Sequence, residues 1–154
     1  MTYDIQPASL HELHLCVPFG EAFHKEMQLP GEFIGQCFVD FWITLLATLP
    51  SVIFLLRKQG ELIGGIGGAI SPNPNDGRLC AQEQFWFVDK AYRGGSGAIR
   101  LVDAFEDWAR SKDAVEVRVA RMMTGADQPG IERFYDKRGY GMLEIHYRKP
   151  LVKE

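Results

Sequence analysis

Between residues 79 and 119 the chain runs without a break from an apolar segment through a glycine-rich turn into an amphipathic helix, and then into a second apolar segment. Residues 79–88 are typical of a strand, and the apolar residues from Ala98 to Ala109 share one helical face. Valines at every second position from 115 to 119 indicate another strand. A helix that connects two strands in this way makes them parallel. The sequence therefore predicts an α/β fold that contains a βαβ unit.

Hydrophobic periodicity and turn signals divide the rest of the chain, with no repeat and no interdomain linker. Ser9 and Glu12 have the spacing of a capping box, which predicts a helix start. The expected strands are 2–7, 52–56, 62–70, 79–88, 115–119 and 142–149, and the expected helices follow Ser9 and cover 33–49, 98–112 and 131–138. This order, β-α-α-β-β-β-α-β-α-β, predicts a single domain over residues 1–154, an α/β (α+β) mixed sheet with helices on its faces.

The composition argues against several classes of protein. Seventeen Lys and Arg against twenty Asp and Glu give a net charge of −3 without a basic run, which disfavours nucleic-acid binding. The longest uncharged run, residues 41–56, contains Pro50 and is shorter than the about 20 apolar residues of a membrane helix. The N-terminus lacks a basic region followed by an apolar one, so no secretory signal is expected. We therefore expect a cytoplasmic protein with no membrane partner.

Cysteine and histidine spacing gives little support for a metal or a disulfide. Cys16, Cys37 and Cys80 lie far apart in mostly apolar segments, which predicts buried, reduced thiols, with a reactive cysteine as the alternative. His11 and His14 are one residue too close together for the zinc motif H-E-x-x-H, and no third ligand is apparent. No metal is expected.

The turn from Arg93 to Ala98 contains three glycines. Uncovered backbone N–H groups beside a helix N-terminus attract anions such as a pyrophosphate, and Arg93 could add a charge-assisted bond. A flexible turn with a glycine-assisted cap is the alternative. A P-loop is excluded because Ala98-Ile99 stands where Lys and Ser or Thr are needed, and the dinucleotide fingerprint also fails. The glycines of 64–68 predict a strand that bends or lets another group approach closely.

The strand, the Arg93–Ala98 turn, the helix and the later Phe-Tyr-x-x-x-Gly-Tyr of residues 134–140 resemble the GNAT superfamily of N-acetyltransferases. The resemblance covers essentially the whole chain. In the family's acetyl-coenzyme A (acetyl-CoA) signature, Arg93 and Ala98 match, whereas Ser96 stands where an inner glycine is usual. The resemblance implies acetyl-CoA as co-substrate, bound by Phe87, Val88, Arg93, Gly94, Gly95, Ser96, Gly97, Ala98, Gln128 and Phe134.

The resemblance also implies two catalytic residues. Tyr135 matches the tyrosine that protonates the leaving thiolate, and Glu83, five residues before Val88, matches the glutamate that some members use as a base. A free amine on lysine titrates near about 10.4, so a base with a path to solvent is useful, and Glu83 would serve through a water. The alternative for Glu83 is a strand carboxylate that pairs with a neighbour on the sheet. A backbone N–H near Val88 would hold the oxyanion.

These inferences predict transfer of an acetyl group to a primary amine by direct attack in a ternary complex. The acceptor, a small molecule or a peptide, is not identified by the sequence. A non-catalytic acyl-CoA-binding or regulatory module with the same fold is the alternative, and a structural domain whose turn binds nothing is a third reading. Dimers are common in the resembled family, and the sequence leaves the oligomeric state open.

Overall fold

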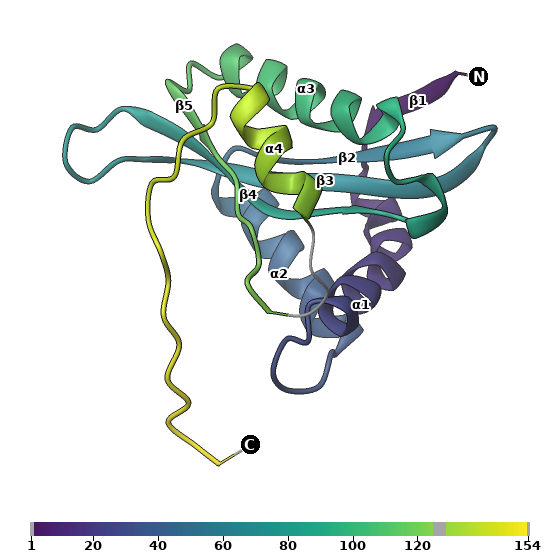
Figure 1. Cartoon of the computed structure of the whole chain (residues 1–154), viewed down its shortest axis with the longest axis horizontal. Coiled ribbons are helices and arrows are strands. Elements are labelled where there is room, and N and C mark those ends of the chain that lie inside the picture. The colour runs from purple at the N-terminus through teal and green to yellow at the C-terminus, as the bar shows by residue number, and fades with distance from the viewer. Residues whose placement is uncertain (1, 125–128, 154) are drawn as a thin grey trace.

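The computed structural model describes residues 2–124 and 129–153, which form a mixed sheet with helices on both faces (Figure 1). The sheet has five strands in the order β1-β2-β3-β4-β5. Strands β1 to β4 are antiparallel neighbours, and β5 is parallel to β4. The strands are β1 (Tyr3–Pro7), β2 (Ser51–Lys58), β3 (Glu61–Pro72), β4 (Leu79–Val88) and β5 (Glu116–Arg118), and the α-helices are α1 (Val17–Glu26), α2 (Gly35–Thr48), α3 (Ser96–Ser111) and α4 (Pro129–Lys137). The expected α/β mixed sheet and its βαβ unit are confirmed.

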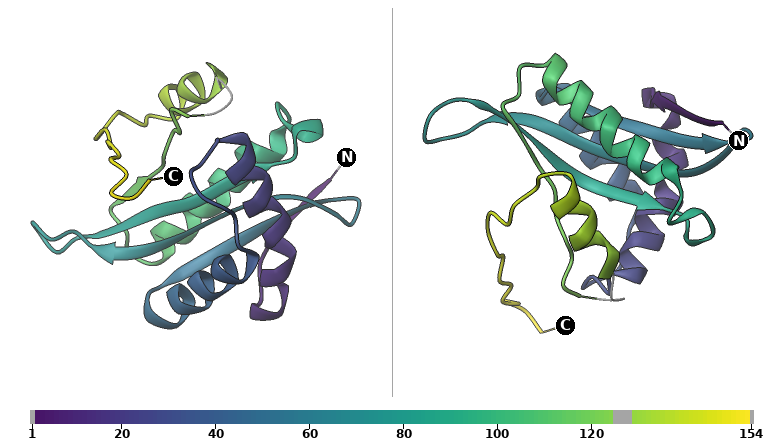
Figure 2. Two further views of the ribbon diagram at one scale, coloured as in Figure 1. Left: turned by 90° about the horizontal axis from the view of Figure 1, so that it is seen from below. Right: turned by 45° about the horizontal axis from the view of Figure 1, so that its top comes forward.

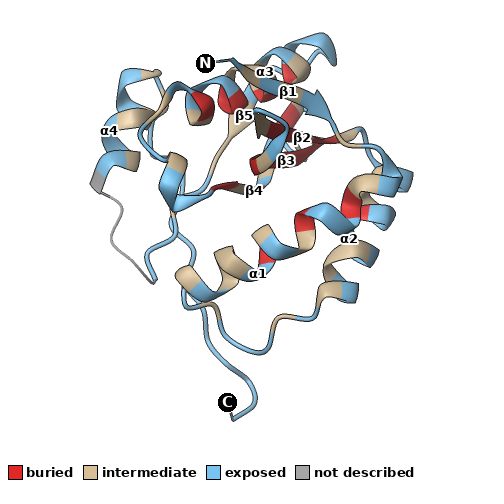
Figure 3. Cartoon of the chain, turned by 90° about the vertical axis from the view of Figure 1, so that its right-hand side faces the viewer, coloured by how far each residue is buried: buried red, intermediate tan, exposed pale blue. Residues whose placement is uncertain are grey.

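Each face of the sheet has its own hydrophobic core. On one face, Phe105 and Leu101 of α3 pack against Ile66 and Ile70 of β3. On the other face, Trp42 of α2 packs with strand residues that include Phe85, and α1 covers the neighbouring part of the sheet (Figure 2). Buried residues therefore concentrate on the strands and on the sheet-facing sides of the helices (Figure 3). This two-sided burial explains why β2, β3 and β4 are apolar over most of their length.

Glycines in β3 allow the helices to approach closely. A Cβ added at Gly67 would lie 2.7 Å from the Trp42 ring, and one added at Gly68 would lie 2.5 Å from the Phe105 ring and 2.3 Å from the Gln82 carbonyl oxygen. Side chains at these positions would displace α2 or α3 from the sheet. The expectation that the glycines of 64–68 permit close approach is confirmed.

A β-bulge lies opposite these glycines. Gly67 pairs with Phe85 whereas Gly68 pairs with Glu83, so Gln84 is the extra residue of β4. Phe85 belongs to the core beneath α1 and α2, whereas Trp86 packs against the core beneath α3. The bulge thus separates Glu83 from Phe85, which strict alternation would place on the same face.

The strand expected at residues 142–149, here called the C-terminal segment, is not formed. No strand is assigned there within the described part of the chain, and Met142, Leu143, Ile145 and Tyr147 are 64–93% exposed. Gly139 ends α4 with a φ of 83°, and the chain then runs away from the sheet (Figure 1). Alternating apolar residues specify the two faces of a strand, but a strand also needs a hydrogen-bonding neighbour.

The expectation that the cysteines are buried is correct for two of the three residues. Cys16 and Cys80 are buried, whereas Cys37 is exposed in the first turn of α2, where it points away from the sheet core. All three thiols are free. Burial raises the pKa of Cys16 to about 12, so this thiol is a packing residue and not a nucleophile.

Among the described residues, no helix has the length and apolar character needed to span a membrane.

Candidate active site

The sheet opens between β4 and β5. The two strands pair only over Cys80–Gln82, opposite Glu116–Arg118. Beyond Gln82, β4 continues to Val88 paired with β3 alone within the described residues, while the chain after β5 turns toward α4 (Figure 1). This stretch of β4 therefore presents an unpaired backbone edge that an extended ligand can pair with.

Glu83 and Tyr135 meet at this open edge. The Ala120 N–H donates to the Glu83 carboxylate over 3.1 Å. The Tyr135 hydroxyl donates to the Ala120 carbonyl oxygen over 2.9 Å. The two residues come from β4 and α4, and residue 120, two positions after the end of β5, brings them together. The alternative, in which Glu83 pairs with a neighbouring residue on the sheet, does not describe this contact. The Glu83 carboxylate instead accepts from a backbone N–H that lies outside the sheet.

The surroundings of these two groups shift their proton affinities. Burial raises the pKa of Glu83 to about 7, against the opposing effect of the hydrogen bond from Ala120. Burial, followed by the charge of Glu83, raises the pKa of Tyr135 well above its usual range. Near neutral pH the carboxylate can therefore accept a proton, and the phenol keeps the one that it carries.

An aromatic wall lies beside them. The Trp86 ring is 5.4 Å from the Phe134 ring and 6.3 Å from the Tyr135 ring, measured between centroids. The indole N–H of Trp86 is buried and has no hydrogen-bond partner among the described residues. Trp86 was not among the residues expected at the site, because an aromatic residue in an apolar strand looks like any core residue in the sequence.

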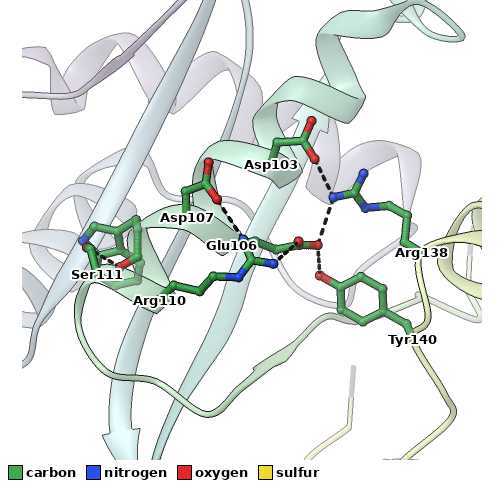
Figure 4. A network of polar contacts seen from close by, with 8 residues as sticks. Asp103, Glu106, Asp107, Arg110, Ser111, Arg138 and Tyr140 are labelled. Atoms are coloured by element: carbon green, nitrogen blue, oxygen red, sulfur yellow. Dashed lines mark hydrogen bonds and ion pairs between the residues drawn. The ribbon is translucent and has the colours of Figure 1, made fainter.

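A network of ion pairs and hydrogen bonds connects the C-terminal end of α4 to α3 and thereby positions Tyr135. Arg138 binds the carboxylates of Asp103 and Glu106, and the Tyr140 hydroxyl donates to Glu106 over 2.8 Å (Figure 4). Glu106 also accepts from Arg110 of its own helix. Burial raises the pKa of Tyr140 above its usual range, so its hydroxyl stays a donor.

The glycine turn leads from β4 into α3. Gly94 has a φ of 82°, which favours glycine, and Gly95 precedes the first turn of α3 with no side-chain hydrogen bond to cap it. Ser96 is exposed and Gly97 is buried, where an added Cβ would lie 3.0 Å from Leu56 and Tyr3. The uncapped N–H groups at the start of α3 are suited to an anion.

The Arg93 side chain makes contacts that were not expected. Its Nη2 donates to the Glu26 carboxylate over 2.9 Å, Nη1 pairs with the other oxygen of that carboxylate, and Nε donates to the Val88 carbonyl oxygen over 2.7 Å. The Glu26 side chain is only 8% exposed, and the hydrogen bond from Arg93 lowers its pKa. Arg93 thus joins the end of α1 to the turn, and its side chain is not free for an anion in this structure.

The remaining sequence-predicted residues fall on different faces. The Phe134 ring is in the aromatic wall, and Ala98 is half-buried at the start of α3. Phe87 packs against Phe19 of α1, so its side chain faces away from α4 and only its backbone is close to the open edge. Gln128 lies outside the described residues.

A cavity of about 250 Å³ opens on the other face of β4, between α1 and α2. Its lining is mostly aromatic and includes two polar side chains, His24 and Gln84. The lining residues are Gly20, Phe23, His24, Leu29, Phe33, Phe38, Phe41, Trp42, Gln84 and Phe85. Gln84 and Phe85 directly follow Glu83 in β4, so this cavity and the open edge flank the same stretch of strand.

Comparison with known proteins agrees with the fold. The chain belongs to the acetyltransferase (GNAT) family, whose model matches residues 9–140. No curated protein matches the sequence.

Solved structures share the fold at low sequence identity. A predicted acetyltransferase from Clostridium acetobutylicum with acetyl-CoA superposes with a TM-score of 0.80 at 14% identity, over 97% of each chain. An aminoglycoside acetyltransferase from an uncultured soil metagenomic sample gives 0.76 at 19% identity, over 99% of this chain and 100% of that one. A ribosomal-protein-alanine N-acetyltransferase from Brucella melitensis gives 0.68 at 17% identity, over 99% of each chain.

Proposed function

We propose that this protein transfers the acetyl group of acetyl-CoA to a primary amine by direct attack in a ternary complex. The observation that carries the proposal is the pair Glu83 and Tyr135, a carboxyl group with a pKa of about 7 and a protonated phenol held by one residue. An ammonium group must lose a proton before it attacks, and a thiolate leaves more readily when it gains one. The pair supplies one group for each task.

In the proposed reaction Glu83 takes the proton of the amine through a water, and the amine nitrogen bonds to the thioester carbonyl carbon. A backbone N–H near Val88 stabilises the oxyanion. The carbon–sulfur bond then breaks, Tyr135 gives its proton to the sulfur, and the nitrogen releases its second proton to solvent as the amide forms. The phenol regains a proton through solvent as Glu83 releases its own. Because the hydroxyl donates to Ala120 in this structure, Tyr135 has to exchange that acceptor for the sulfur.

The start of α3 supports the choice of donor. The uncapped N-terminus with Gly94, Gly95 and Ser96 suits the pyrophosphate, and the open edge of β4 suits the pantetheine amides. A thermal-shift titration with acetyl-CoA tests this assignment, since a ligand of the folded state raises its melting temperature. We expect stabilisation that Ser96→Asp weakens by charge repulsion and that Asn75→Asp, in the exposed β3–β4 loop, leaves unchanged. The absence of a shift in the wild type would refute the donor.

The cavity between α1 and α2 suggests the kind of acceptor. Its aromatic lining favours an amine attached to an apolar or aromatic group over a highly charged polyamine. Phe41→Ala should lower kcat/KM for phenethylamine more than for ethylamine. The matched control is Ile43→Ala, another exposed apolar residue of α2 that is not in the lining. Equal losses for both amines, or a preference of the wild type for spermidine, would contradict the assignment.

Thiol release separates an enzyme from a binding module. We expect acetyl-CoA-dependent release of free thiol with at least one amine in a panel of alkylamines, arylalkylamines, lysine peptides and aminoglycosides. Stabilisation by acetyl-CoA without turnover across that panel would favour the non-catalytic module.

A further inference from the structure

The two proposed catalytic groups depend on a piece of chain without regular structure. This β5–α4 segment, residues 119–124, contains Ala120, which is hydrogen-bonded to both Glu83 and Tyr135. No helix or strand is assigned to these residues, all of which the structure describes. Strand β5, which precedes the segment, is only 3 residues long. The position of Ala120 therefore depends on contacts that the segment makes with other elements.

One of these contacts is with the end of α1. The Thr124 hydroxyl donates to the Met27 carbonyl oxygen over 2.6 Å. Met27 directly follows α1 and is 5% exposed. The last carbonyl groups of a helix have no partner within the helix, and Thr124 supplies one from outside. Since α1 packs on the face of the sheet opposite α3, this bond connects the β5–α4 segment to the far face.

The same end of α1 is also connected to β4. Glu26, the residue before Met27, pairs with both terminal nitrogens of Arg93, and the Arg93 Nε donates to the Val88 carbonyl oxygen. The Asp89 N–H donates to a carbonyl oxygen of β3. Because successive residues of an antiparallel strand direct their backbone groups to opposite sides, those of Val88 face the open edge. Arg93 therefore joins Glu26 to the open edge of β4.

Two consecutive residues of α1 thus hold the two sides of the open edge. Glu26 is connected to β4 through Arg93, and Met27 is connected to the β5–α4 segment through Thr124. We call these four residues the α1 bridge. In Figure 1 the chain after β5 runs toward the end of α1. Since β4 and β5 pair with each other only over Cys80–Gln82, the bridge is a second connection between the two sides.

We propose that Thr124 and Glu26 are positioning residues of the acetyl transfer, because the α1 bridge fixes Ala120 relative to β4. The inference rests on the proposed function, in which Glu83 is the base and Tyr135 is the acid. A group displaced by about 1 Å from its reacting atom can lose about 10²-fold in rate. Without the bridge the β5–α4 segment can move away from β4, and the hydrogen bonds of Ala120 change with it.

Steady-state kinetics of Thr124→Val test the proposal. Valine keeps the shape of the side chain but lacks the donor, so kcat should fall by about tenfold with little change in the KM for acetyl-CoA. Thr124→Ser, which keeps the hydroxyl, should retain the wild-type kcat. The matched control is Thr48→Val, since the Thr48 hydroxyl donates to a carbonyl oxygen within α2 over 2.8 Å. It should leave kcat unchanged. A wild-type kcat in Thr124→Val, or an equal loss in Thr124→Ser, would overturn the proposal.

A double variant tests whether the bridge acts as one unit. Glu26→Gln breaks it on the side of β4, and Thr124→Val breaks it on the side of the β5–α4 segment. If both residues act through the bridge, the double variant should have the kcat of the slower single variant. Losses that multiply would show that the two residues act independently, which would refute the bridge.

Hydrogen exchange separates this inference from the proposed function. The Ala120 N–H is protected by its bond to Glu83, and its exchange can be measured whether or not the protein acetylates an amine. This amide should exchange about tenfold faster in Thr124→Val, and at the wild-type rate in Thr48→Val. Unchanged exchange in Thr124→Val would refute the bridge even in an active enzyme. Faster exchange in Thr124→Val, with no turnover by the wild type, would support the bridge and refute the proposed function alone.

Discussion

Glu83 and Tyr135 are hydrogen-bonded to the same residue: the Ala120 N–H donates to the carboxylate over 3.1 Å, and the Ala120 carbonyl oxygen accepts from the phenol over 2.9 Å. One peptide segment thereby fixes a proton acceptor and a proton donor relative to each other. A shift of residue 120 would move both groups, so the short pairing of β5 with β4 is part of the catalytic geometry that we propose.

The first prediction concerns the pH dependence of the rate. If Glu83 is the base, kcat/KM should rise with pH through the pKa of about 7 of its carboxyl group, because only the ionised form accepts a proton. Glu83→Gln should remove this limb and lower kcat/KM by about 10²-fold. Initial rates of thiol release from pH 5.5 to 9 measure both effects. The control Glu61→Gln should keep the wild-type pH profile. If the rise of kcat/KM with pH persists in Glu83→Gln, that rise belongs to another titrating group.

The same carboxyl group should make stability depend on pH. Its pKa is raised from the ordinary 4.5 to about 7 in the folded protein, so between these values the folded state holds a proton that the unfolded state has released. The free energy of unfolding should therefore fall as the pH rises through this range, by roughly 2–3 kcal/mol. Urea denaturation of wild type and Glu83→Gln at several pH values measures it. If the free energy of unfolding changed equally with pH in the two proteins, this would argue against a raised pKa of Glu83.

Tyr135→Phe should lower kcat by about 10²-fold with little change in the KM for acetyl-CoA, since the phenol acts when the sulfur leaves. The lost hydrogen bond to Ala120 should cost about 1 kcal/mol of stability. Steady-state kinetics and a denaturation curve separate the two effects. Tyr147→Phe, at a residue 93% exposed, should leave kcat unchanged. A wild-type rate in Tyr135→Phe would transfer the role of acid to water.

The Glu26–Arg93 pair should couple α1 to the glycine turn. A double-mutant cycle with Glu26→Gln and Arg93→Gln should give a coupling energy of roughly 1–2 kcal/mol, limited because the Arg93 side chain is 34% exposed. The corresponding cycle at the exposed Asp76–Arg78 pair should give a smaller coupling energy, because solvent screens this pair. Chemical denaturation of the variants provides both values, and equal coupling at the two sites would contradict a special role for Glu26.

Gly68→Ala should destabilise the protein by roughly 2–4 kcal/mol, because the new Cβ would lie 2.3 Å from the Gln82 carbonyl oxygen. Gly130→Ala in α4, where an added Cβ meets nothing within 4 Å, should be neutral or stabilising. Thermal unfolding of both variants makes the comparison. A stable Gly68→Ala protein would show that the sheet can relax around the new methyl group.

Most of the fold could be predicted because its signals are local. The stripe of apolar residues before Pro50 gave α2, and the valines after residue 114 gave β5. The C-terminal segment could not be placed in the same way, since alternation does not identify the neighbouring strand. The bulge at Gln84 was also invisible, because the glycines that permit it lie on β3.

Residues of the candidate site could be predicted where they belong to a family motif, but not where only tertiary contacts bring them to the site. The motifs pointed to Glu83, Tyr135 and the Arg93–Ala98 turn. The role of Ala120 as their common partner, the buried indole of Trp86 and the contact of Arg93 with Glu26 depend on segments that are far apart in the sequence. An alanine or an isolated glutamate carries no signal for such contacts.

The bulge in β4 determines the distance along the strand between Glu83 and Val88, as well as the face of the sheet on which Glu83 lies. Glu83 and Val88 are five residues apart in the sequence, but their partners Gly68 and Gly64 on β3 are only four apart. The base and the backbone near the expected oxyanion are thus separated by about 13 Å of strand, not by about 17 Å. Loss of Gln84 would remove the bulge and keep this span, because four residues of regular strand also cover about 13 Å. In aligning this protein with other acetyltransferases, the number of residues between the two positions therefore matters as much as their identity.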